Sequence, residues 1–117
     1  MLSSNPAFMG NVNVLRNRFV ELIHRAKVGH FVYPSKHFFE RVVERNLDEV
    51  DILRMITPVI KEFRETTYNE RTYLVSWRQY GLAASIQLGL VSEKRQIILR
   101  TIYDKYDEMA YDVCIRL

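Results

Sequence analysis

Apolar residues near the start of the chain recur at the spacing of an α-helix. Positions three or four apart share a helix face, and five apolar residues fall on one such stripe: Leu15, Phe19, Leu22, Ile23 and Ala26. Asn11 or Asn13 would cap this helix, and Gly29 would end it because glycine accepts the left-handed conformation found at helix ends. Residues 1–10 hold a proline and a glycine among small, polar side chains, and we expect a flexible arm there.

Two more helices are expected after an extended connector. Ser35 is the expected N-cap of residues 36–45, and Asn46 can close that helix because asparagine tolerates a positive φ angle. Asp48 would cap the third helix, whose first turn carries the acidic residues that the helix dipole favours. Pro58 would end the third helix, because the residue before a proline avoids helical geometry.

The pattern changes to that of strands beyond residue 70. Three segments are rich in β-branched and aromatic residues or alternate in polarity: 72–77, 82–90 and 96–103. Residues 59–67 fit either a strand or an extension of the preceding helix, and residues 106–117 fit either a helix or a last strand. Helices followed by a strand meander indicate one α+β domain over residues 11–117. We expect two or three N-terminal helices packed on an antiparallel sheet of three to five strands.

The composition is that of a globular protein with an uneven charge. Of the 117 residues, 48% are hydrophobic and 26% are charged, which argues against disorder. The net charge is +3. Residues 1–47 carry seven basic and three acidic side chains, whereas residues 48–117 carry ten and eleven. An arginine-rich N-terminal part favours contact with a polyanion such as nucleic acid, because the guanidinium group matches phosphate.

Several kinds of site are excluded by missing motifs. The sequence has no P-loop, dinucleotide fingerprint, GxSxG or HExxH motif, and its three histidines lie six and seven residues apart, which no single helix face brings onto one ion. Cys114 is the single cysteine, so it forms no internal disulfide and is expected in the core. No apolar run approaches the ~20 residues of a membrane helix, and no signal-peptide pattern is present. We expect a cytoplasmic domain without cofactor, metal or membrane contact.

One column of residues on the second expected helix points to chemistry. His37, Arg41 and Arg45 follow one another at intervals of four, so they line up along one side. A histidine that titrates near neutral pH and two phosphate-binding arginines are the groups that metal-independent RNA cleavage needs. An ordinary solvated face is the alternative, because Glu40 and Glu44 alternate with the arginines and can pair with them.

Residues 35–52 resemble a small family of bacterial and phage domains of uncharacterised function. The family pattern opens with a serine and a histidine and continues with two arginines four residues apart. The family also has a second motif in a late strand, which residues 97–103 (IILRTIY) resemble. This family is grouped with the metal-independent ribonuclease toxins related to RelE, barnase and colicin D. The resemblance covers residues 33–105. Asn46 stands where the family pattern shows glycine.

The resemblance implies three catalytic residues. His37 would be the general acid or base, Arg41 would hold the scissile phosphate, and Thr101 would donate to the phosphate or orient His37. For Thr101 the plain alternative is packing within the sheet.

Further residues would contact the nucleic acid. Arg45 would bind a neighbouring phosphate, and Tyr103 would stack on a base or donate its phenol, with sheet packing again as the alternative. Arg78 and Arg100 are additional cationic candidates, and Arg100 should face away from Thr101 if the strand is regular.

These observations leave functions of different classes open. The first is an RNA-binding, metal-independent endoribonuclease of the toxin type, which cleaves by attack of the 2′-hydroxyl and leaves a cyclic phosphate. The second is a catalytically inactive protein of a phage or mobile element that binds and inhibits a host protein or pairs with an antitoxin or immunity protein. The near-neutral C-terminal part favours the second, and fold alone does not decide activity. A homodimer through the apolar first helix is a third alternative.

Overall fold

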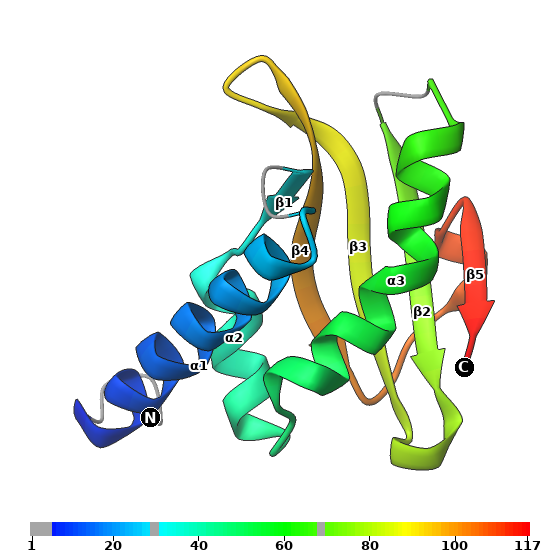
Figure 1. Cartoon of the computed structure of the whole chain (residues 1–117). Coiled ribbons are helices and arrows are strands. Elements are labelled where there is room, and N and C mark those ends of the chain that lie inside the picture. Colours follow the sequence, from blue (N-terminus) through cyan, green and yellow to red (C-terminus); the bar gives the residue numbers. More distant parts are fainter. Residues whose placement is uncertain (1–5, 29–30, 68–69) are drawn as a thin grey trace.

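The computed structural model describes residues 6–28, 31–67 and 70–117. Three helices precede most of the sheet: α1 (Pro6–Arg25), α2 (Lys36–Glu44) and α3 (Glu49–Glu65). The strands are β1 (Val32–Tyr33), β2 (Arg71–Trp77), β3 (Leu82–Val91), β4 (Lys94–Tyr103) and β5 (Val113–Arg116), with short 3-10 helices η3 (Arg78–Tyr80) and η4 (Glu108–Ala110). The expected α+β fold with N-terminal helices is confirmed (Figure 1).

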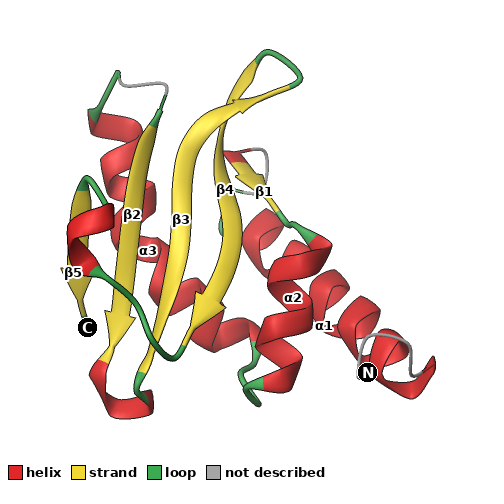
Figure 2. Ribbon diagram, turned by 180° about the vertical axis from the view of Figure 1, so that it is seen from behind, coloured by secondary structure: helices red, strands yellow, loops and turns green. Residues whose placement is uncertain are grey.

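The strands form one mixed sheet in the order β1-β4-β3-β2-β5. Strands β2, β3 and β4 make the expected antiparallel meander. Both edge strands run parallel to their neighbours, β1 beside β4 and β5 beside β2, so the sheet is not purely antiparallel as expected. Helix α3 crosses one face of the sheet, and the segment between β4 and β5 crosses the other (Figures 1 and 2).

A single apolar core joins the helices to one face of the sheet. Successive side chains of a strand point to opposite faces of the sheet, and alternate strand residues belong to this core: Tyr73, Val75, Ala84, Ile86 and Leu88. Helix α1 packs against α2 and α3, and the rings of Phe19 and Phe39 lie 5.3 Å apart. Leu15, Phe19 and Ile23 of the apolar stripe of α1, which a homodimer was one alternative to cover, are therefore buried inside the chain.

Helix α1 begins and ends earlier than expected. It starts at Pro6, because the fixed φ of proline suits the first turn of a helix and Phe8 is buried in the core. Residues 6–10 are therefore helical, and residues 1–5 of the expected arm lie outside the described residues. The helix is closed by Lys27, at φ 60°, and not by Gly29, which also lies outside the described residues.

Helix α3 continues past Pro58, so the expectation that it ends near residue 57 is wrong. The expected cap is confirmed: the Asp48 carboxylate accepts from the Asp51 backbone N–H. The Asp51 carboxylate also accepts from the Asp48 backbone N–H, which completes a capping box. An interior proline costs about 3 kcal/mol, whereas burying one large apolar side chain stabilises by about 1.5–3 kcal/mol. Because three such side chains of the second half are buried, packing outweighs the proline: Val59, Ile60 and Phe63.

Polar contacts also fix the second half of α3 to the sheet. The Tyr73 hydroxyl donates to the Glu62 carboxylate at 3.3 Å, and Arg95 donates to the Phe63 carbonyl at 2.7 Å while its guanidinium lies over the Phe63 ring. Burial, together with the negative charge of Glu62, raises the pKa of Tyr73 to about 12. Tyr73 therefore remains a neutral donor throughout the ordinary pH range.

The last segment ends as a strand, which was one of the two expected alternatives. Strand β5 pairs with β2, and Asp112, the residue before β5, is hydrogen-bonded to β2. Its carboxylate accepts from the Thr72 backbone N–H at 2.8 Å and from the Thr72 hydroxyl at 3.1 Å. Of the helices in residues 6–28 and 31–67, none is long and apolar enough to span a membrane.

Asp112→Asn should make the melting temperature less sensitive to acid. The hydrogen bonds from Thr72 hold the pKa of Asp112 below its usual value, so its stabilisation is present above the unfolded-state pKa and is lost as the pH falls through the folded-state value. The variant should melt lower than the natural chain at pH 7, and the difference should narrow as the pH falls below the ordinary pKa of 3.8. Circular dichroism melts would test this, with Glu93→Gln as the control. An unchanged gap at pH 3 would contradict the assignment.

Candidate nucleic-acid interface

Strand β1 fixes the position of α2 beside the sheet. Its two residues pair in parallel with Ile97 and Ile98 of β4, and α2 begins only three residues later, at Lys36. Helix α2 then runs along the remainder of β4 in the same direction (Figures 1 and 2). Three apolar side chains bury the inner face of the helix and hold it there: Phe38, Phe39 and Val42.

The predicted column lies next to this buried face of α2. His37 and Arg45 are exposed and Arg41 is half-buried. Within the part of the chain that the structure describes, the His37 side chain makes no hydrogen bond or ion pair. Its imidazole is therefore accessible to a ligand.

Both arginines of the column are paired with carboxylates. Arg41 Nη1 lies 2.5 Å from Glu44 Oε2, and Arg45 Nη2 lies 3.6 Å from Asp104 Oδ2. The solvated-face interpretation predicted the first of these pairs. Partly exposed ion pairs contribute only about 0–1 kcal/mol, so a phosphate can replace either carboxylate at small cost.

A β-bulge shapes the part of β4 that faces this helix. Thr101 pairs with Ser85, but the next pair along β4 uses Leu99, so Arg100 is an extra residue in the strand. Leu99 and Ile102 are consequently both buried in the core although they are three positions apart. A regular strand would have sent one of them to the opposite face.

The bulge brings Arg100 to the same face as Thr101. Arg100 Nη1 donates to the side chain of Gln87 at 2.5 Å, and Gln87 lies two residues from Ser85, the partner of Thr101. The expectation for a regular strand, with Arg100 and Thr101 on opposite faces, is therefore wrong. Tyr103 follows on the same face and is 40% exposed. This face is the one that α3 does not cover.

The column on α2 and the polar face of β4 run side by side. The contact between Arg45 and Asp104 places the end of α2 beside the end of β4. His37 lies eight residues before Arg45, which is about 12 Å along a helix and corresponds to between three and four strand residues. His37 is therefore roughly level with Arg100 and Thr101. No hydrogen bond joins His37 or Arg41 to Thr101 in the described ranges.

Arg78 lies apart from the column on α2. It is exposed on η3, after the end of β2, where it lines a pocket of about 530 Å³ with Tyr106 and Arg116. Glu108 pairs with Arg116 at 2.5 Å. The sequence did not indicate that Tyr106 and Arg116 lie near Arg78. The segment before β5 crosses the sheet and brings them to this pocket (Figure 2).

The remaining predicted features have structural roles. Cys114 is half-buried, and its Sγ lies 3.2 Å from the Glu108 carbonyl, beneath η4. Among residues 6–28, 31–67 and 70–117, no three His, Cys, Asp or Glu side chains gather as metal ligands would. The side chains at the α2–β4 surface include imidazole, guanidinium and hydroxyl groups.

Asp104→Asn should strengthen the binding of a polyanion, because it releases Arg45 and removes one negative charge beside the column. We expect the dissociation constant of fluorescein-labelled oligouridylate at low salt to fall about threefold, because an exposed ion pair contributes little free energy. Fluorescence anisotropy measures this constant. Glu93→Gln removes the same charge at the opposite end of β4 and serves as the control. Equal effects of both variants would mean that only net charge matters.

Comparisons with protein-family models, with curated proteins and with solved structures found no match to this chain.

Proposed function

We propose that the α2–β4 surface binds RNA and cleaves it without a metal ion. The observation that carries this proposal is that His37 is exposed, without a hydrogen-bond or ion-pair partner among the described residues, in a helix column with Arg41 whose last member, Arg45, contacts Asp104 just after β4. Residues 35–52 resemble a family of uncharacterised function that is grouped with the metal-independent ribonuclease toxins, and this resemblance supports the same interpretation.

The proposed reaction needs only groups that this surface offers. His37 Nε2 or Nδ1 takes the proton of the ribose 2′-hydroxyl, whose oxygen attacks the adjacent phosphorus and displaces the 5′-oxygen. The leaving oxygen is protonated by water or by the Tyr103 phenol, and a 2′,3′-cyclic phosphate remains. Arg41 and Arg100 donate to the phosphate oxygens, where negative charge builds up in the transition state.

His37→Ala should abolish RNA cleavage while leaving the fold intact. General acid–base catalysis contributes about 10²–10⁴-fold, so the rate of cleavage of a fluorogenic oligoribonucleotide in EDTA should fall at least about 100-fold. The melting temperature should stay the same, because His37 is exposed. His24→Ala is the matched control, since His24 is exposed on α1. A His37→Ala variant that is as active as the natural chain would falsify the catalytic assignment.

RNA affinity should fall steeply with salt, because phosphate contacts release counterions. Arg41→Ala should lower the slope of log affinity against log salt by about 0.7–1, the value of one phosphate contact. Arg64→Ala, which removes an exposed arginine of α3, should leave the slope unchanged. A single-stranded RNA titration at four salt concentrations measures both. Identical slopes for Arg41→Ala and the natural chain would exclude Arg41 from the interface.

The second candidate function is that of a catalytically inactive protein that binds another protein. The two ion pairs of the column favour it, because they neutralise Arg41 and Arg45 when no ligand is present. The salt titration separates the two functions: a chain that binds no RNA even at low salt would support the inactive interaction protein.

A further inference from the structure

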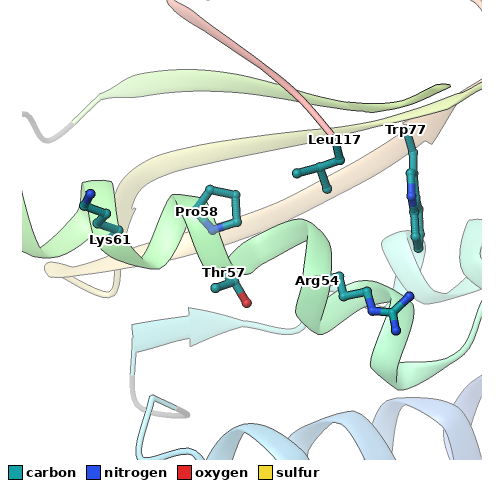
Figure 3. Close-up of a pocket in the computed structure, with 6 residues that line it drawn as sticks. All are labelled: Arg54, Thr57, Pro58, Lys61, Trp77 and Leu117. Atoms are coloured by element: carbon teal, nitrogen blue, oxygen red, sulfur yellow. The ribbon is translucent and has the colours of Figure 1, made fainter.

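A second site lies between α3 and the end of the β2–β5 edge, apart from the α2–β4 surface. It is a pocket of about 570 Å³, a size typical of ligand sites. Six residues line it, and none of them belongs to α2 or β4 (Figure 3): Arg54, Thr57, Pro58, Lys61, Trp77 and Leu117.

The centre of this pocket is apolar. Figure 3 shows Leu117 reaching toward α3 between Pro58 and Trp77. The Leu117 backbone is held by its N–H donating to the Ser76 carbonyl at 2.9 Å, and Trp77 packs edge-on against Tyr80. The Thr57 hydroxyl donates to the Leu53 carbonyl at 2.6 Å, so it is used within the helix. The pocket therefore favours a large apolar group at its centre.

Two cations stand at the ends of the pocket. Arg54 and Lys61 are seven residues apart on α3, which is about 10.5 Å along the helix, and both are exposed. Neither has an ion-pair partner in the ranges that the structure describes. Among the described residues that line the pocket, none is acidic. An apolar centre with a cation at each end is complementary to a ligand with an apolar group between two anionic groups.

We propose that this pocket binds an acidic peptide segment of a partner protein. One large apolar side chain of the segment enters the pocket and packs against Leu117 (Figure 3), and two carboxylates about 10 Å apart along the segment reach Arg54 and Lys61. A fatty acid offers a single carboxylate and satisfies one of the cations only. A nucleobase would have to stack on the ring of Trp77, but Trp77 is only 6% exposed, so little of that ring is open to stacking. The site goes beyond the proposed function, because it shares no residue with the α2–β4 surface.

Trp77 makes the site directly observable, because it is the single tryptophan of the chain. The probe is an alanine-based helical peptide of 15 residues with glutamate at its positions 4 and 11 and leucine at its positions 7 and 8. The two glutamates are seven residues apart, as Arg54 and Lys61 are, and the leucines lie between them on the same face of the helix. We expect a saturable change in Trp77 emission with a submillimolar dissociation constant. Replacing both glutamates of the probe by glutamine, or both leucines by alanine, should weaken binding at least tenfold.

Charge reversal in the protein tests the same contacts. The double variant Arg54→Glu and Lys61→Glu should weaken probe binding at least tenfold, and Leu117→Asp should do the same by placing a carboxylate in the pocket. Arg64→Glu is the matched control on α3, outside the pocket, and should bind like the natural chain. All four of these positions are exposed, so circular dichroism should show an unchanged fold.

Several outcomes would overturn the proposal. No saturable emission change up to 2 mM peptide, or equal binding of the glutamine peptide, would exclude an acidic peptide. Tighter binding of decanoate than of the peptide would assign the pocket to a small amphiphile. An emission change that depends on protein concentration alone, with dimers in sedimentation, would assign it to a second copy of the chain. Failure of RNA cleavage has no bearing on these results, because Trp77 emission reports only this site.

Discussion

The short parallel pairing of β1 with β4 is the constraint on which the candidate interface depends. Only two residues pair, yet they fix the chain at the sheet edge immediately before α2 begins. Helix α2 must then run beside β4, and its buried aromatic and valine side chains keep it there. The part of β4 that follows its pairing with β1 has no strand neighbour on its outer side among the described residues. Helix α2 contacts this part of β4 and protects its edge from pairing with another chain.

The β-bulge of β4 gives this edge its chemistry. The extra residue turns Arg100 toward the face that carries Thr101 and Tyr103, while the strand still buries Leu99 and Ile102. The resulting surface combines cations from a helix and hydroxyl groups from a strand. Glu44 and Asp104 pair with Arg41 and Arg45, and both ion pairs remain partly exposed, so breaking either would cost only about 0–1 kcal/mol.

The sequence predicted the elements whose signals are local. The structure confirms three predictions that follow from neighbouring residues: Asp48 as the cap of α3, the positive φ of Asn46 and the β-branched strands from residue 71 onward. Pro58 was misread because burial of the residues that follow it, which only the sheet provides, outweighs its local cost.

The candidate site was less predictable than the fold. The column of His37, Arg41 and Arg45 follows from helical spacing, but the partnership of Arg45 with Asp104 joins residues far apart in the sequence. The orientation of Arg100 depends on a one-residue register shift, which no property of residues 96–103 signals. Likewise, the apolar pocket requires Trp77 and Leu117 to meet α3, and that meeting is set by the pairing of β5 with β2.

The most direct test of the central claim is a nuclear magnetic resonance titration of the ¹⁵N-labelled chain with a 2′-O-methyl oligouridylate, which cannot be cleaved by 2′-hydroxyl attack. If the α2–β4 surface binds RNA, amide shifts should change along residues 36–45 and 99–104 and stay constant around Trp77. Shifts confined to other elements, or none at low salt, would contradict the account.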